Sequence, residues 1–370
     1  MQPALNFAAV LGLALAVAGA GTARAESLAW PTDAWPRADG SEPYRPEAIG
    51  RFLKTAFADD APEFFQGARG VVVIHGGKLV AEAYREVDGY GPQSRFVSWS
   101  EAKSVTQALS GIAVRKGLLE LHAAAPVPQW QAGDDPRAAI TLDQLLRMSS
   151  GLEWEEGAGG LDDSSVMLFG SGRRDMAAFA AGKPLLHAPG DHWAYATGTT
   201  MIVSGLLRGA VGGTEQAYRA FIADELLEPL GMRSAVAEFD PAGTFVGGTS
   251  FYASTRDYAR FGLLYLRDGV WNGRRILPEG WCDYSRSVTP HSDGKYGAHF
   301  WLGPVGEADV LAAQGLALPD DMYQARGMGG QFIAIIPSRD VVIAYNGYSE
   351  VQDYAPIDVY FAKILALLAE

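Results

Sequence analysis

Val97-Ser98-Trp99-Ser100, followed by a helical pattern from Ala102 to Lys116, is the stretch that decides how this chain folds and what it does. The first four residues are predicted to be extended, and apolar residues then recur at helical spacing. Ser100 and Lys103 lie three residues apart, so a helix start brings the hydroxyl and the amine together. A serine becomes a nucleophile when a base takes its proton, and a lysine is such a base when burial or nearby positive charge lowers its pKa.

Helix capping is the alternative role for Ser100. A capping box has Glu or Gln three residues after the cap, where this chain has Lys103, and a lysine in the first turn opposes the helix dipole. Ser98 is a rival serine, but the residue three positions after it is Glu101, which suits a cap and cannot activate it in this way. Taken alone, the pair supports catalysis and capping about equally, because short motifs need structural context.

The composition is that of a globular protein. The chain has 370 residues, 48% of them hydrophobic and 20% charged, which is enough for two packed units or one domain with a large insertion. Its net charge of −13 makes nucleic acid an unexpected partner. Cys282 is the only cysteine, so an intramolecular disulfide is impossible. No metal-binding pattern of histidines or cysteines occurs in the sequence, and we expect neither a metal nor a cofactor.

Residues 1–25 have the pattern of a secretory signal peptide. An apolar run covers Ala8 to Ala20, and Ala23-Arg24-Ala25 forms a small-x-small cleavage site before Glu26. The run is short for a membrane span, and no cysteine is present there for a lipid anchor. We therefore expect a periplasmic or secreted protein that has no stable membrane anchor after cleavage.

The remaining chain predicts strands near both ends and helices in the middle. Residues 26–45 are expected to form an irregular arm, and 153–172 an acidic, glycine-rich loop that is either solvated or attracts a cationic ligand. This order predicts an α/β domain from 46–130 and 271–370, interrupted by a mostly helical domain at 131–270. Helices are expected over 46–57, 102–116, 142–148, 175–181, 199–211, 215–227, 255–266 and 356–368, and strands over 70–75, 79–84, 296–302, 331–336 and 341–345.

Four further segments carry a resemblance to a known family. Ile140–Leu152, Pro189–Thr197, Glu228–Met232 and Ser254–Gly262 resemble, in this order, segments of the serine β-lactamase and penicillin-binding-protein superfamily. The likeness is closest to its class C, esterase and 6-aminohexanoate-dimer-hydrolase branch. It implies a β-lactamase/transpeptidase-like α/β fold, in which a central antiparallel sheet is flanked by helices and a mostly helical domain is inserted.

The resemblance also implies roles for particular residues. Ser100 would be the nucleophile, Lys103 would take or relay its proton, and Tyr195 would act with Lys103 as a base before it passes a proton to the leaving group. A tyrosine does this beside a cation that stabilises its phenolate, which Lys103 would supply. The backbone N–H groups of Ser100 and Met328 would form the oxyanion hole.

Two elements depart from the family pattern. In Ala325-Arg326-Gly327-Met328-Gly329, Ala325 stands where the family has Lys or His, and strand alternation turns Arg326 to the other face. Thr197 stands where the family has Asn, and it still offers a hydroxyl. Both changes count against β-lactam specificity but not against acyl transfer. The predicted substrate-binding residues are Trp99, Thr197, Gly327 and Gly329.

Three functions follow from these observations. The first is a secreted serine hydrolase whose partner is a small-molecule ester or amide. The second is a β-lactamase or D-Ala-D-Ala carboxypeptidase, and the third is a non-catalytic binding module on the same fold. Gly248–Tyr252 only approaches a G-x-S-x-G elbow, which disfavours an α/β-hydrolase. His187 and His192 lie near Tyr195 in the sequence and are expected to have a loop or packing role.

Overall fold

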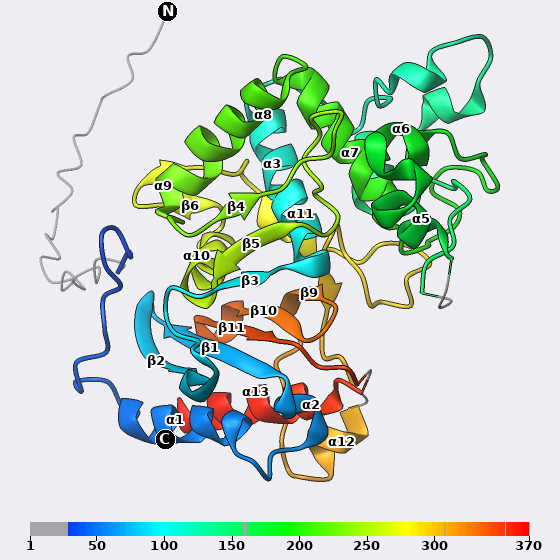
Figure 1. Ribbon diagram of the computed structural model, residues 1–370. Coiled ribbons are helices and arrows are strands. Elements are labelled where there is room, and N and C mark those ends of the chain that lie inside the picture. Colours follow the sequence, from blue (N-terminus) through cyan, green and yellow to red (C-terminus); the bar gives the residue numbers. More distant parts are fainter. Residues whose placement is uncertain (1–28, 158–160, 307, 352, 370) are drawn as a thin grey trace, which may run out of the picture.

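The computed structural model describes residues 29–157, 161–306, 308–351 and 353–369. The predicted signal peptide lies outside these residues. Figure 1 shows a lower half built around a large sheet and an upper half made mostly of helices. No helix in the described part of the chain is long and apolar enough to cross a membrane.

The large sheet is antiparallel and joins the two ends of the chain. Its strand order is β2-β1-β11-β10-β9-β8, so the last strand lies beside the first. Gly76 and Gly77 both have positive φ and form the predicted hairpin turn. The central antiparallel sheet predicted from the sequence is therefore confirmed. The strands are β1 (Ala68–His75), β2 (Lys78–Tyr84), β8 (Trp301–Leu302), β9 (Tyr323–Gly327), β10 (Gln331–Ile336) and β11 (Val341–Gly347).

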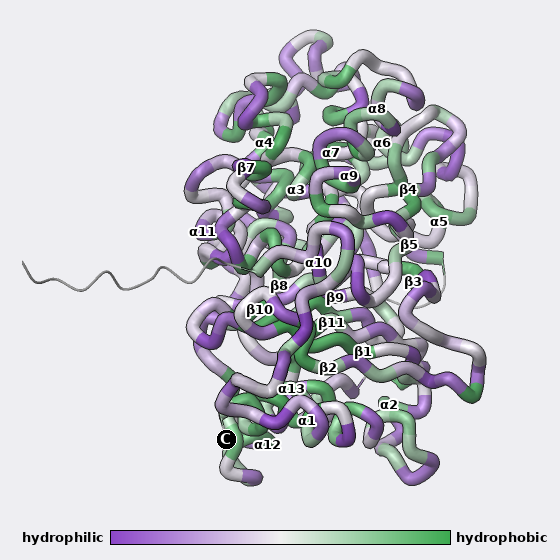
Figure 2. The backbone as a smooth tube through the Cα atoms, turned by 90° about the vertical axis from the view of Figure 1, so that its left-hand side faces the viewer, coloured by the Kyte–Doolittle hydropathy of each residue, from purple (hydrophilic) through white to green (hydrophobic). Residues whose placement is uncertain are grey.

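Helices cover both faces of this sheet. On the outer face, α1 (Pro46–Leu53) and α13 (Ala355–Leu367) pack on one apolar cluster, and on the inner face α3 (Ala102–Arg115) and α10 (Thr255–Leu266) belong to another. Figure 2 shows hydrophobic residues in β1, β11 and α13. Strands that are buried on both faces are expected to be hydrophobic along their whole length. The inner face carries α3, and with it the Ser–Lys pair.

The upper half contains most of the remaining helices and two small sheets. One small sheet, of order β3-β5-β4, pairs the strand before Ser100 with the strand before α10. The helices are α2 (Glu63–Gln66, in the lower half), α4 (Leu142–Leu146), α5 (Asp163–Phe169), α6 (Met176–Ala181), α7 (Thr197–Ala210), α8 (Glu215–Ile222), α9 (Glu228–Leu230), α11 (Trp281–Arg286) and α12 (Ala308–Ala312, in the lower half), and the strands are β3 (Arg95–Val97), β4 (Val236–Ala237), β5 (Phe251–Ser254), β6 (Val270–Trp271) and β7 (Arg274–Arg275).

Several local predictions were wrong. Trp99–Glu101 is a 3₁₀ turn rather than an extended segment. The predicted strand 296–302 shrinks to β8, because Gly297 turns the chain against the Ser285 carbonyl, a contact that leaves no room for a Cβ. The predicted loop 153–172 contains α5, whose first turn is capped by the Asp162 side chain. The apolar pattern alone did not indicate β9, in which charged and polar residues interrupt it, whereas the family resemblance places Ala325 and Arg326 on a strand.

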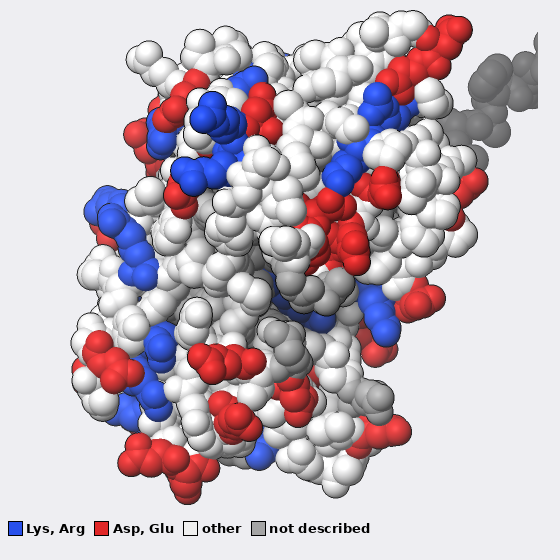
Figure 3. Space-filling view, turned by 45° about the vertical axis from the view of Figure 1, so that its right-hand side comes forward, with Lys and Arg blue, Asp and Glu red and all other residues white. Residues whose placement is uncertain are grey.

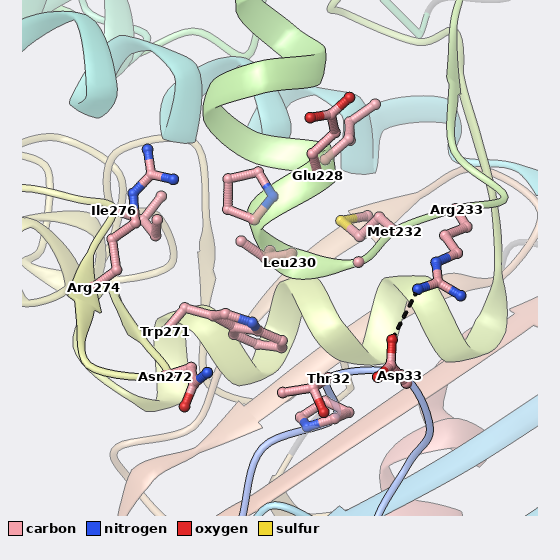
Figure 4. Close-up of a pocket in the computed structure, with 14 residues that line it drawn as sticks. Thr32, Asp33, Glu228, Leu230, Met232, Arg233, Trp271, Asn272, Arg274 and Ile276 are labelled. Atoms are coloured by element: carbon pink, nitrogen blue, oxygen red, sulfur yellow. Dashed lines mark hydrogen bonds and ion pairs between the residues drawn. The ribbon is translucent and has the colours of Figure 1, made fainter.

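The N-terminal arm lies against the upper half. The Arg260 side chain donates a hydrogen bond to the Pro31 carbonyl, and Arg233 pairs with Asp33 at 3.2 Å. Figure 4 shows the pocket that forms there, with Thr32 and Asp33 of the arm facing Trp271 and Met232. None of the predicted catalytic residues lines this pocket. We therefore assign it to the seating of the arm.

Gly262 tests how tightly α10 packs on the sheet. A Cβ at this position would lie 2.6 Å from Val342 Cγ1 and 2.8 Å from Ile333 Cγ2. We expect Gly262→Ala to lower the free energy of unfolding by about 1–3 kcal/mol, because the contact forces the helix off the strands. Gly209 in α7 has nothing within 4 Å of that position, so Gly209→Ala should be neutral or stabilising. Urea denaturation of both variants measures the difference, and equal stabilities would contradict this packing.

Candidate active site

Ser100 and Lys103 form a hydrogen-bonded pair at the start of α3. Ser100 belongs to the 3₁₀ turn Trp99–Glu101 and is partly exposed, whereas Lys103 is the second residue of α3 and only 1% exposed. Lys103 Nζ lies 2.9 Å from Ser100 Oγ. The N-cap position of α3 is Glu101, without a side-chain cap bond, so Ser100 does not cap the helix.

Ser98, the rival serine, has a structural position. Its side chain is fully buried, and its hydroxyl accepts a hydrogen bond from the Phe251 N–H at 3.2 Å. It can donate its own proton to the carbonyl oxygen of Trp99 at 2.9 Å or to that of Thr249 at 3.2 Å. Ser98 therefore ties the nucleophile turn to β5 and faces no lysine.

The Lys103 amine is surrounded by three oxygen atoms. In its ammonium form it donates to Ser100 Oγ at 2.9 Å, to Thr197 Oγ1 at 2.9 Å and to the Gly248 carbonyl at 3.0 Å. Burial lowers the pKa of Lys103 to about 8, and the negative charge of Glu156 opposes this shift. The sequence suggested burial or a nearby positive charge as the cause of a lowered lysine pKa, and burial is the cause found here.

Two adjacent glycines allow the backbone to reach this amine. A Cβ at Gly248 would lie 2.6 Å from Thr197 Cγ2, and a Cβ at Gly247 would lie 2.2 Å from Thr106 Oγ1. Only a residue without a side chain fits at either position. The segment that approaches a G-x-S-x-G elbow in the sequence thus supplies an acceptor for Lys103.

Glu156 is a residue of this site that the sequence analysis missed. Its carboxylate accepts hydrogen bonds from the Thr197 N–H at 2.6 Å, the Thr197 hydroxyl at 2.6 Å and the Trp154 indole N–H at 2.8 Å. Glu156 comes from the acidic loop, for which the sequence left open a solvated loop or the attraction of a cationic ligand. Its carboxylate is instead hydrogen-bonded to Thr197 and Trp154 within the chain. The only signal in the sequence was that long loops in compact domains are often functional.

Tyr195 lies on the other side of the lysine. Lys103 Nζ is 4.8 Å from the centroid of the Tyr195 ring, which stacks on Trp301 at 5.4 Å. Burial raises the pKa of Tyr195 strongly, the Glu156 charge raises it further, and hydrogen bonding to the Ser100 side chain opposes the rise. The tyrosine is therefore held in its protonated, phenol form.

The end of β9 closes the site from below. A Cβ at Gly327 would lie 2.1 Å from the Ser98 carbonyl oxygen, so this glycine lets the strand press against the nucleophile turn. The following residue, Met328, has a half-exposed side chain, and its N–H donates to no other described residue. Gly329 continues the turn with φ 73°. The Met328 N–H therefore has no hydrogen-bond acceptor among the described residues, and its place in the oxyanion hole stays a prediction.

Comparison with known protein sequences identifies the family of this chain. A family model described as Beta-lactamase matches residues 62–358. The chain belongs to the β-lactamase family. Protein Rv1367c of Mycobacterium tuberculosis (strain ATCC 25618 / H37Rv) is 24% identical over 322 residues, which cover 71% of this chain and 80% of that protein.

Solved structures of other β-lactamase-like proteins have the same fold. A provisionally named 6-aminohexanoate-dimer hydrolase from Bacillus anthracis aligns with a TM-score of 0.68 at 20% identity, covering 92% of this chain and 89% of that one. A penicillin-binding-protein homologue from Caulobacter crescentus aligns with a TM-score of 0.65 at 18% identity, covering 90% and 98%. At this identity, the likeness shows the fold alone. The predicted family and fold class are both confirmed.

The cationic residue of other family members is absent from β9. Ala325 is buried on the face toward α3, within the same apolar cluster. Arg326 pairs in register with Phe332, which belongs to the cluster on the opposite face. Its guanidinium donates to the Gly303 carbonyl at 2.7 Å, and it interacts electrostatically with Asp358 on α13. The guanidinium also lies 5.3 Å from the ring centroid of Trp301, so Arg326 is held at the edge of the sheet beside Trp301 rather than at the position of Ala325.

The four residues predicted to bind substrate do not share one environment. The hydroxyl of Thr197 is engaged by Lys103 and Glu156 rather than left for substrate. Trp99 has φ 45° and lines a groove with Phe169 and Tyr252, next to the nucleophile turn. Figure 3 shows one face of the molecule hollowed between the two halves, with acidic side chains above the hollow. The roles of Trp99, Gly327 and Gly329 in substrate binding stay predictions.

The histidines and the cysteine stand outside the reaction chemistry. Among the described residues, no three His, Cys, Asp or Glu side chains gather to hold a metal ion. The exposed rings of His187 and His192 lie 4.2 Å apart between centroids and are tilted by 32°. His299 is buried behind Lys103, where burial lowers its pKa to about 3, and it bonds to the Thr200 hydroxyl at 2.9 Å. Burial raises the pKa of the Cys282 thiol and leaves it unreactive.

The pH dependence of the free energy of unfolding tests whether Lys103 is buried with a lowered pKa. Its pKa falls from 10.5 to about 8 on folding, so the unfolded chain binds more protons between these values, and stability rises with pH across this range. Relative to Lys103→Met, we expect the wild type to gain about 2 kcal/mol between pH 8 and pH 10. Lys54→Met, which alters an exposed lysine, should follow the wild-type curve. Urea denaturation at each pH measures this, and parallel curves for wild type and Lys103→Met would contradict it.

Proposed function

We propose that this chain is an exported serine hydrolase that cleaves an ester or a small amide through an acyl-enzyme on Ser100. The observation that carries the proposal is the 2.9 Å contact between Ser100 Oγ and a buried amine whose pKa is about 8. Such an amine is a base at near-neutral pH, and an exposed lysine is not. Export rests on the predicted signal peptide at residues 1–25.

Acylation begins with the neutral amine of Lys103. It takes the proton of Ser100 as Oγ bonds to the carbonyl carbon of the substrate, and the carbonyl oxygen becomes an oxyanion. The free N–H of Met328, together with the N–H of Ser100, would stabilise that charge. Collapse of the intermediate then breaks the bond to the leaving alcohol or amine.

Tyr195 acts as the acid in this proposal. Its pKa is raised, so it carries a proton that it can give to the leaving group, and the Lys103 ammonium can replace that proton. This revises the role implied by the family resemblance, in which the tyrosine is first a base. In deacylation, water loses a proton to the neutral amine of Lys103 as its oxygen bonds to the ester carbon. The ester C–O bond then breaks, and the Lys103 ammonium returns that proton to Ser100 Oγ.

The β-lactamase or carboxypeptidase alternative is favoured by membership of the family and disfavoured by one residue. A penicillin-type substrate carries a carboxylate beside the scissile bond. Ala325 offers it no charge, and Arg326 binds on the opposite face of the sheet. Burying a carboxylate without a cation is costly. An uncharged ester or amide therefore fits this site better. A binding module without turnover is the third possibility. The presence of Lys103 as a base beside Ser100 counts against it.

Covalent labelling tests the nucleophile. A fluorophosphonate probe should add one group to the wild type, and mass spectrometry of peptides should locate it on Ser100. Ser100→Ala should lose the label and lose hydrolysis by on the order of 10³-fold or more. Ser98→Ala is the matched control, because Ser98 is buried and bonded to the main chain. Labelling that persists in Ser100→Ala would contradict the assignment.

Substrate preference tests the missing cation. We expect kcat/KM for short-chain nitrophenyl esters to exceed that for a chromogenic cephalosporin by at least about tenfold, the effect of about 1.4 kcal/mol. Ala325→Lys places a cation where the family has Lys or His. This variant should lower the ratio of kcat/KM for the esters to kcat/KM for the cephalosporin. A cephalosporin turned over as well as the esters by the wild type would favour the β-lactamase alternative.

A further inference from the structure

The hydroxyl of Thr197 lies between two partners that compete for its single proton. Its Oγ1 is 2.6 Å from Glu156 Oε1 and 2.9 Å from Lys103 Nζ. A carboxylate only accepts hydrogen bonds, and this one also receives the Thr197 N–H and the Trp154 indole N–H. The hydroxyl proton is therefore given to Glu156. What Thr197 presents to the lysine is an electron pair.

This arrangement decides where the electron pair of the lysine points. A neutral amine has two N–H groups and one electron pair. The Gly248 carbonyl, at 3.0 Å from Nζ, can only accept, and Thr197 Oγ1 is left with only acceptor capacity toward Lys103. These two oxygens take both N–H groups. The electron pair then points at the third neighbour, Ser100 Oγ, at 2.9 Å.

We propose that Glu156 is a positioning residue for Lys103: by holding the Thr197 hydroxyl as an acceptor, its carboxylate directs the electron pair of the lysine at Ser100. The inference rests on the proposed function, in which Lys103 takes the proton of Ser100. Without the carboxylate, Thr197 can turn its proton toward Lys103 Nζ. That hydrogen bond would occupy the electron pair that the reaction needs.

Glu156 is also the charge that acts on this amine. The other titratable groups around Lys103 are Tyr195, Tyr296 and His299. Burial raises the pKa of both tyrosines and lowers that of the histidine to about 3, so all three are uncharged near neutral pH. The Glu156 charge favours the ammonium form of Lys103 and raises its pKa.

Loss of the carboxylate therefore has two effects on the reaction. The pKa of Lys103 falls, so the acidic limb of the pH profile moves to lower pH and more of the amine is neutral at pH 7. The maximal rate falls as well, because the electron pair is no longer directed at Ser100. A residue that only fixed the loop would lower the rate without lowering the pKa of Lys103.

The first experiment measures kcat/KM for a nitrophenyl ester against pH. For Glu156→Gln we expect a maximum lower by on the order of 10- to 100-fold, a part of what a positioned base contributes, and an acidic limb at lower pH. Glu155→Gln is the matched control, since it removes the same charge from an exposed neighbour on the same loop. Thr197→Val should lower the maximum similarly, and the double variant should be no slower than either single one, because both act through one hydroxyl.

The second experiment needs no substrate. Nitrogen NMR of protein labelled at the lysine Nζ, with the Lys103 signal assigned by its loss in Lys103→Met, gives the pKa of Lys103 directly. We expect it near 8 in the wild type and in Glu155→Gln, and lower in Glu156→Gln. The positioning role is wrong if Ser100 is acylated but Glu156→Gln keeps the wild-type maximum of kcat/KM and the wild-type pKa of Lys103. If Ser100 is never acylated in the wild type, the proposed function itself is wrong.

Discussion

The buried amine of Lys103 is the group on which the whole site depends. Its low pKa comes from exclusion of water, and the three oxygens around it come from three separate segments: the turn before α3, the start of α7 and the Gly247–Gly248 pair. Each must approach closely enough to leave no room for water. The glycines allow this, since a side chain at either position would overlap a neighbour. The chemistry of the site is thus set by packing between helices far apart in the sequence.

Burial and charge act differently on the two groups beside Ser100. On Lys103 the two effects oppose each other, and the pKa stays near the pH at which a base is useful. On Tyr195 they add, and the phenol keeps its proton. One carboxylate, Glu156, therefore acts on the pKa values of both the proposed base and the proposed acid. Environments that drive two titratable groups apart in this way mark acid and base roles in other enzymes.

Much of this arrangement follows from the sequence, and the rest depends on tertiary contacts. The periodic segments of α3 and α10, and the hairpin of β1 and β2, form as predicted because their patterns are strong and local. The sequence also brings Ser100 and Lys103 together, since they lie three residues apart across the junction between the 3₁₀ turn and α3. Glu156 escapes prediction because its loop has no period and its partner Thr197 lies 41 residues away. The apolar pattern does not reveal β9 because polar residues interrupt it; only the family resemblance indicates this strand, and its place is fixed by pairing with β10.

The order of strands in the large sheet has a consequence for when the protein becomes active. The nucleophile turn belongs to the first third of the chain, whereas the Met328 amide arrives with β9 near the end. A chain still emerging from the ribosome has the serine and the lysine but no strand to close the site beneath them. Pairing over such separations is slow, since long loops must close before the contacts form. For the proposed hydrolase, the donor at Met328 is therefore in place only after the C-terminal strands dock, so the proposed site stays incomplete throughout synthesis.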